Sequence, residues 1–157
     1  MERQTKCTVY KTHINPILVY GSECWPLSKK DGNMLRIFES RILRMVYISI
    51  NDDSIWRTRY HHELYTLYDD LDIVQLVKIG RVRWLGQLFR MHELGPCRKL
   101  TVLQPEGTRR AGKTKVRWLE SVEEHLKKMG VRNWRRMSQD REQWREIVEE
   151  VKVHQKL

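Results

Sequence analysis

One stretch of the sequence matches a phosphate-binding pattern residue by residue. Four residues separate Gly107 from Gly112, and Lys113 and Thr114 follow directly, which is the order of a phosphate-binding loop. In such loops the glycines let backbone amides approach phosphate oxygens, the lysine neutralises their charge and the threonine holds magnesium. A nucleotide-hydrolysing loop should follow a buried parallel strand, and only the short run 100–104 is strand-like. The pattern therefore favours a basic loop that contacts the phosphates of a polymer, and a small NTPase stays open as a weaker alternative.

Other reactive residue types stand at spacings that do not form a site. Asp69 and Asp70 follow Tyr68 directly, one place closer than the aspartate pair with which polymerases bind two magnesium ions. The position four residues after His62 is Thr66, whereas a zinc-binding helix needs a second histidine there. We therefore expect no catalytic group, no bound metal and no cofactor.

Basic residues are concentrated in the middle of the chain. The 157 residues include 30 Lys or Arg and 20 Asp or Glu, a net charge of +10. Within 75–117, eleven basic residues are opposed only by Glu93 and Glu106, so this segment carries +9. Such a concentration indicates a surface for a polyanion, with a merely solvated surface as the alternative. The residues predicted to contact the phosphates of RNA or DNA are Lys78, Arg81, Arg83, Arg90, Arg98, Lys99, Arg109, Arg110, Lys113, Lys115 and Arg117.

Helical periodicity runs through most of the chain and defines the elements that must position these cations. It predicts an all-α fold with two small helical subdomains, 1–70 and 71–157. Within the second subdomain, a basic loop with Gly and Pro at 94–114 joins the fourth helix to the fifth, and the fold contains at most one short strand, 100–104. About six helices are expected, over 5–20 with a break at Pro16, 28–47, 55–68, 73–91, 116–129 and 138–153.

Apolar stripes on these helices identify the expected core. The helix over 73–91 is apolar on two sides, which predicts that it is sandwiched, and close approach of another backbone would explain Gly80 and Gly86. Trp134, beside Arg135 and Arg136, is the best candidate for an exposed tryptophan. The stripes are Leu35, Phe38, Ile42 and Met45; Trp56, Tyr60, Leu64 and Leu67; and Trp144, Ile147, Val148 and Val151.

The chain shows no signal of secretion or membrane insertion. No apolar run approaches the roughly 18 residues of a membrane span, and no signal peptide is indicated at the start. An odd number of widely spaced cysteines predicts free thiols in a reducing compartment; these are Cys7, Cys24 and Cys97. We expect an intracellular protein, nuclear or cytoplasmic, without a membrane partner.

Several short segments, in their order and spacing, resemble the C-terminal region of non-LTR (LINE-type) retrotransposon reverse transcriptases. They are Tyr10–Trp25, Ile79–Gly86 with Arg90 and Met91, Arg117–Trp118, Asn133–Trp134, and Asp140–Arg141 with Trp144. The resemblance runs from about Lys6 to His154. The sequence departs from the family at Gln87, where the family commonly has His, and at 111–114, where Ala-Gly-Lys-Thr replaces Arg-Gly-Arg-Pro.

The resemblance implies that residues 1–70 form the end of the polymerase thumb and that residues 71–157 form the helical segment that follows it. In the family these parts grip template RNA and primed DNA, while the catalytic palm and the endonuclease lie upstream. The sequence thus indicates a non-catalytic nucleic-acid-binding fragment rather than an RNA-directed DNA polymerase. A helical protein-interaction module or an inert transposon relic is the alternative. Oligomeric state, sequence specificity and the choice between RNA and DNA stay open.

Overall fold

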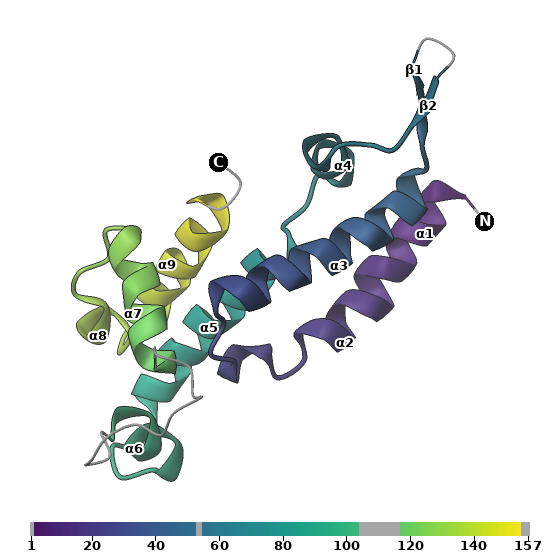
Figure 1. Ribbon diagram of the computed structural model, residues 1–157. Coiled ribbons are helices and arrows are strands. Elements are labelled where there is room, and N and C mark those ends of the chain that lie inside the picture. Colours follow the sequence, from purple (N-terminus) through teal and green to yellow (C-terminus); the bar gives the residue numbers. More distant parts are fainter. Residues whose placement is uncertain (1, 53–54, 104–116, 155–157) are drawn as a thin grey trace. The chain divides into compact units, whose positions relative to one another are not determined.

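A computed structural model describes residues 2–52, 55–103 and 117–154 (Figure 1). The chain divides into two compact units. Unit 1 consists of Met1–Tyr20 and Lys29–Leu76, and unit 2 of Gly21–Ser28 and Val77–Leu157. The described residues are mostly helical, which confirms the predicted fold class in outline. No described helix is both long and apolar enough to cross a membrane.

Unit 1 is built from helices and one β-hairpin. The predicted first helix is divided near Pro16, which stands in the first turn of α2, where a missing N–H is tolerated. A π-helical segment, η1, precedes this turn. The elements are α1 (Arg3–Val9), η1 (Tyr10–Ile14), α2 (Asn15–Val19), α3 (Lys29–Tyr47), β1 (Ile50–Asp52), β2 (Ile55–Arg57), α4 (His61–Tyr68) and the beginning of α5 (Ile73–Arg90).

The hairpin corrects two predictions, a helix starting at residue 55 and at most one strand. β1 pairs with β2 in antiparallel register, with Asn51 opposite Trp56. The helix begins only at His61, because the Glu63 carboxylate fixes the residues before it. This carboxylate accepts a hydrogen bond from the Tyr60 N–H at 2.7 Å. It also accepts hydrogen bonds from the two terminal guanidinium nitrogens of Arg57, at 2.9 and 2.8 Å. Trp56, which was predicted to face the core, is 69% exposed.

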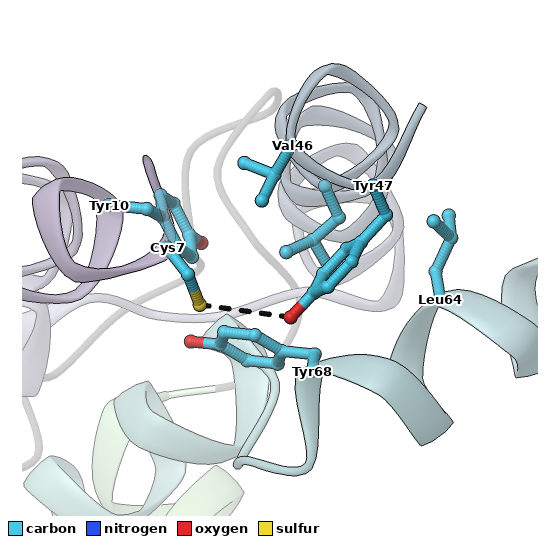
Figure 2. Packing of buried hydrophobic residues seen from close by; sticks show 7 residues of the cluster. Cys7, Tyr10, Val46, Tyr47, Leu64 and Tyr68 are labelled. Atoms are coloured by element: carbon cyan, nitrogen blue, oxygen red, sulfur yellow. Dashed lines mark hydrogen bonds between the residues drawn. The ribbon is translucent and has the colours of Figure 1, made fainter. Parts of the chain in front are cut away.

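The core of unit 1 lies between α1, η1, α3 and α4 (Figure 2). The stripe predicted for α3 is wrong at Phe38 and Met45, which are exposed, whereas Ile42 packs against the core. The helix buries the adjacent face instead, including the polar residues Glu39 and Ser40. The apolar core of unit 1 consists of Cys7, Tyr10, Leu43, Val46, Tyr47, Leu64 and Tyr68.

Unit 2 surrounds the C-terminal part of α5 with short helices. The predicted strand 100–104 is wrong, because Pro96 occupies the first turn of a helix that runs to Val102, a position that proline favours. The additional elements are η2 (Ser22–Cys24), α6 (Pro96–Val102), α7 (Trp118–Lys128), α8 (Trp134–Met137) and α9 (Arg141–His154). The six predicted helices are therefore present, and α6 and α8 are additional.

Two tryptophans, one on α8 and one on α9, pack against α5. The predicted apolar stripe of α9 is confirmed, with Trp144 buried and its Nε1–H donating to the Val82 carbonyl at 3.1 Å. The indole occupies the space that a side chain at Gly86 would need, so a ring rather than a backbone explains this glycine. A close approach was also predicted at Gly80, but no atom lies within 4 Å of a Cβ added there. Trp134, the best candidate for an exposed tryptophan, is only 5% exposed and packs edge-on against Phe89.

Candidate nucleic-acid interface

Seven of the eleven predicted phosphate-contacting residues lie in the described part of the chain. Four of them, Arg109, Arg110, Lys113 and Lys115, lie outside the described residues, as does the Gly107–Thr114 pattern. The other seven all belong to unit 2. By sequence, unit 2 holds twenty basic and eleven acidic residues, a net charge of +9, and unit 1 is close to neutral at +1.

Two of the described arginines hold unit 2 together. Arg98 on α6 donates through Nη1 to the Phe89 and Met91 carbonyls, both at 2.9 Å, and pairs through Nη2 with Glu93. A cation at this position satisfies the last carbonyls of α5 and complements the helix dipole. Arg90 donates through Nη1 to the Ser138 carbonyl at 2.9 Å, at the end of α8. These guanidinium groups therefore have structural partners in place.

Arg81 differs from both because it is buried without a carboxylate. The residue is 4% exposed, and its Nε atom has no hydrogen-bond partner among the described residues. One terminal nitrogen lies 3.4 Å from the Trp118 carbonyl, and the guanidinium lies 5.9 Å from the Trp118 ring centroid. Burial lowers the pKa of Arg81 to about 10. The group stays protonated at neutral pH, so unit 2 contains a positive charge that its own partners satisfy only weakly.

Other cations of α5 and α7 lower the pKa of a histidine on α7. His125 on α7 is half-buried, and burial lowers its pKa to about 4, with further lowering by the charges of Lys78, Arg81 and Lys128. Lys128 also pairs with Glu124 at 2.8 Å. His125 is therefore neutral at pH 7 in a strongly positive environment.

The remaining described candidates lie at the surface. Arg83 on α5 and Lys99 on α6 are exposed. Arg117 is half-buried, and its Nε lies 4.0 Å from Glu120. Arg83 and Lys99 can therefore reach a phosphate without giving up a buried contact.

A second set of cations was not among the predicted contacts. It follows the chain from the end of α7 through α8 to the start of α9, and all its members are exposed. Arg135 pairs with Glu123, whereas Lys127, Arg132, Arg136 and Arg141 form no ion pair with any residue the structure describes. The signal was a local charge count, since 127–141 contains six basic residues and only Asp140 as an acid. We call this set the basic corner: Lys127, Lys128, Arg132, Arg135, Arg136 and Arg141.

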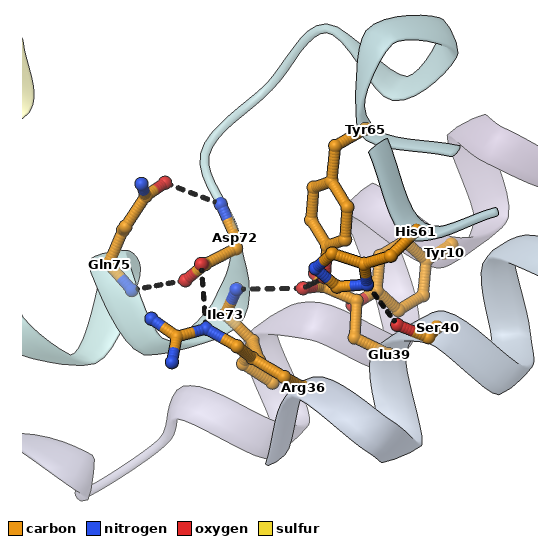
Figure 3. Close-up of polar contacts among 9 residues, drawn as sticks. All are labelled: Tyr10, Arg36, Glu39, Ser40, His61, Tyr65, Asp72, Ile73 and Gln75. Carbon is orange, nitrogen blue, oxygen red and sulfur yellow. Dashed lines mark hydrogen bonds and ion pairs between the residues drawn. The ribbon is translucent and has the colours of Figure 1, made fainter. Parts of the chain in front are cut away.

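Unit 1 contains a polar cluster of a different kind, centred on a buried carboxylate (Figure 3). Glu39 on α3 accepts hydrogen bonds from Tyr10 Oη at 2.8 Å, Tyr65 Oη at 2.5 Å and the Ile73 backbone N–H at 3.1 Å. Burial raises the pKa of Glu39, and these hydrogen bonds oppose the rise. These three donors all come from unit 1 itself, so the cluster joins η1, α3, α4 and α5 rather than forming an open site.

The cysteines are free thiols, as predicted, with Cys7 buried and Cys24 and Cys97 exposed. Among the described residues, no group of His, Cys, Asp and Glu side chains is arranged to hold a metal ion.

Fold and surface thus define a mostly helical protein with one nearly neutral and one strongly cationic unit. The chain is 21% identical over 154 residues to an uncharacterised transposon-derived protein of Caenorhabditis elegans. The match covers 94% of this chain and 55% of that protein, so the chain spans about half the length of the relative. No model of a known protein family matches the chain, nor does any solved structure. The similarity supports a transposon origin.

Proposed function

We propose that the chain binds RNA or DNA through the phosphate backbone, using the exposed cations of unit 2. The observation that carries the proposal is the basic corner, where four exposed cations form no ion pair with the described residues. Cations without a carboxylate partner are available for charge-assisted hydrogen bonds to phosphate oxygens. Contacts of this kind position a strand and carry little sequence information.

Binding, rather than catalysis, is the activity proposed. Protonated lysine and arginine side chains stabilise phosphate charge, but in that form they provide neither a nucleophile nor a general base for strand chemistry. Within a transposon origin, we propose that the chain corresponds to the C-terminal region of a non-LTR retrotransposon reverse transcriptase. Its role there is to grip template RNA or primed DNA without carrying out polymerisation.

The salt dependence of binding tests the proposal. Each neutralised phosphate contributes about 0.7 to 0.9 to the slope of log K against log salt. With about five phosphates engaged, the affinity for a single-stranded oligonucleotide should fall with a slope of about 4. Fluorescence anisotropy at a series of salt concentrations measures this slope. A flat response would contradict the proposal.

A triple variant localises the contacts. Replacing Arg132, Arg136 and Arg141 by Gln should lower the salt slope by about 2 to 3, because each lost phosphate contact removes close to 1. The matched control replaces Lys29, Lys30 and Arg41 by Gln, which removes the same charge from exposed positions of unit 1. An equal loss in both triple variants would indicate a net-charge effect rather than a defined surface.

The exposed apolar side chains of unit 1 favour a second candidate, a protein-interaction module. Ile55 and Trp56 on the hairpin and Met45 on α3 are all at least 66% exposed. Large exposed apolar groups are typical of contact surfaces. If Trp56→Ser abolishes association with a partner while oligonucleotide binding is unchanged, the two functions occupy different units.

A further inference from the structure

A surface hollow of unit 2 lies where the end of α7, the turn to α8 and one face of α9 meet (Figure 1). Its volume is about 400 Å³, which is in the range of small-ligand sites in proteins. All the residues that line it belong to unit 2. The lining face of α9 consists of Gln143, Glu146, Ile147 and Glu150, which recur at helical spacing.

The turn that lines the hollow is held by its own backbone. Gly130 adopts φ of 80°, and the N–H groups of Gly130 and Val131 each donate at 3.0 Å to a carbonyl in the last turn of α7. Such a pair of hydrogen bonds closes a helix in a defined geometry. Further along the turn, the Asn133 carbonyl accepts hydrogen bonds from the Arg136 and Met137 N–H groups. This part of the hollow is therefore formed without a ligand.

The lining combines apolar side chains with polar ones. The apolar members are buried or half-buried: Met129, Val131, Met137 and Ile147. The polar members are exposed: Arg132, Asn133, Gln143, Glu146 and Glu150. A flat ligand with apolar faces and a polar edge matches this lining, and the thioethers of methionines pack well against aromatic rings.

Two carboxylates of the hollow have no cationic partner. Glu146 and Glu150 are exposed and form no ion pair with any residue in the described part of the chain. By contrast, Glu142 and Glu149 each pair with a cation of the same helix, at 3.9 and 2.6 Å. Like charges one helical turn apart disfavour the helix. The two carboxylates are therefore suited to a ligand that donates hydrogen bonds to them.

The hollow is continuous with the basic corner. Arg132 lines the hollow and belongs to the basic corner, and Arg136 directly precedes the lining residue Met137. Cations and carboxylates thus occur together around one apolar hollow. A nucleotide requires both, because its phosphate binds cations and the amino group of a base donates to a carboxylate.

From this arrangement we infer that the hollow receives one base of a bound single strand, with Glu146 and Glu150 accepting its amino group and Arg132 binding its phosphate. The inference rests on the proposed function for the source of the strand. It adds a base preference to phosphate contacts, which by themselves carry little sequence information.

Guanine is the base that fits the carboxylates best. Its ring N–H and its exocyclic amino group are adjacent donors, so one carboxylate can accept both hydrogen bonds. Adenine and cytosine offer an amino group beside a ring acceptor. Uracil has no amino group, and carbonyl oxygens flank its ring N–H and are repelled by a carboxylate. We therefore expect the preference to fall from guanine through adenine and cytosine to uracil.

Base substitution within one strand tests this preference. The probe is a short oligouridine in which one central uridine is replaced by guanosine, and fluorescence anisotropy measures its affinity. We expect the guanosine strand to bind about tenfold more tightly than oligouridine. Inosine, which lacks only the exocyclic amino group of guanosine, should lose most of this gain. Equal affinities for the three strands would overturn the inference.

A double variant separates base recognition from charge. Glu146→Gln combined with Glu150→Gln should abolish the preference for guanosine. The affinity for oligouridine should not fall, because the variant removes negative charge from a unit that attracts phosphate. The matched control, Glu142→Gln with Glu149→Gln, removes the same charge from α9 outside the hollow and should keep the preference. Loss of the preference in both double variants would assign it to net charge and overturn the inference.

Methionine methyl resonances report binding in the hollow directly. A base that packs against Met129 and Met137 should shift their methyl signals through its ring current. We expect guanosine monophosphate to move both signals and ribose 5-phosphate, which has no base, to leave them in place. Met34 and Met45 of unit 1 are exposed and serve as internal references. If guanosine monophosphate moves neither Met129 nor Met137, the hollow is not a base site.

The outcomes distinguish the hollow from the proposed function. If guanosine monophosphate moves the two methionines but no oligonucleotide binds, the base site stands and the proposed function is wrong. If oligonucleotides bind with the expected salt slope but without base preference, the proposed function stands and the base site is wrong. If an oligo-arginine peptide, and not the nucleotide, moves the methionines in a manner that requires Glu146 and Glu150, the hollow binds a cationic side chain and the base assignment is overturned.

Discussion

Among the residues that the structure describes, each unit buries one charged side chain, and the two differ in their hydrogen-bond partners. Glu39 of unit 1 accepts hydrogen bonds from two tyrosines and a backbone amide. Arg81 of unit 2 has one long hydrogen bond and an Nε without a partner in the described residues. The donors of Glu39 come from several elements, so this buried carboxylate joins helices. The difference separates a fully satisfied polar core from a buried cation that is held by one long hydrogen bond.

The largest effect should come from removing the carboxylate of unit 1. Glu39→Ala leaves Tyr10, Tyr65 and the Ile73 amide without their acceptor, and each buried unsatisfied group costs about 1–3 kcal/mol. We expect a loss of about 3 kcal/mol or more in the free energy of unfolding. Faster labelling of the buried Cys7 thiol would report the opening of unit 1, whereas Cys24 and Cys97 are exposed and react in any case. Unchanged labelling of Cys7 would argue against a joining role.

The corresponding change in unit 2 is Gly86→Ala. The added methyl group overlaps the indole of Trp144, and overpacking of this kind costs about 1–3 kcal/mol. Gly80→Ala on the same helix is the matched control, because nothing lies within 4 Å of the added atom. This control should gain up to about 1 kcal/mol from helix propensity. Urea unfolding of both variants tests the contrast, and equal effects would contradict it.

The next largest effect should be the contribution of Glu39 to the pH dependence of the free energy of unfolding. Its pKa is raised in the folded protein, so the folded state binds the proton more tightly than the unfolded state does. The resulting stability is fully present below the unfolded carboxyl pKa of 4.5 and is lost as the pH rises through the folded pKa. Glu39→Gln should remove this fall, which is at most about 1.4 kcal/mol for each pH unit. Urea midpoints of both proteins between about pH 4 and 8 measure the difference; parallel curves would be the contrary result.

The smallest expected effect is a gain in stability at the end of α3. Ile48 adopts φ of 44°, which is costly for a β-branched residue, and its side chain is largely exposed. Arg59 Nε holds this turn by donating to the Tyr47 and Ile48 carbonyls at 3.0 and 3.2 Å. Ile48→Asn should stabilise unit 1 by about 1 kcal/mol. Ile48→Val keeps the branched Cβ and should show no gain in thermal unfolding.

Sequence periodicity predicted the positions of the long helices and the buried stripe of α9. It failed on α3, where hydrophobicity selected Phe38 and Met45 but the helix buries Glu39. The burial of Glu39 could not be predicted, because the tyrosines that satisfy it come from η1 and α4, far away in the sequence. The hairpin was missed for a related reason. Trp56 fits a helical stripe as well as it fits a strand. The contacts of Glu63 with Tyr60 and Arg57 place the start of the helix after the hairpin.

The candidate site was predictable only as a region. Charge counting found Arg81 but could not separate it from Arg90 and Arg98, whose carbonyl partners depend on how α6 and α8 meet α5. The helix α6 was missed although Pro96 after Gly95 is a recognised start signal. His125 carries no sequence signal at all, because its environment is created by α5 and α7 together.

The fit of Trp144 over Gly86 has a consequence for the history of the sequence. Neither position can change alone without disturbing the fold, whereas a smaller ring at 144 would make room for a side chain at 86. Copies that drift without selection should lose the glycine independently of the tryptophan. Copies whose folded product is retained should keep both residues or exchange both, so this pair can distinguish a decaying transposon remnant from a domesticated one.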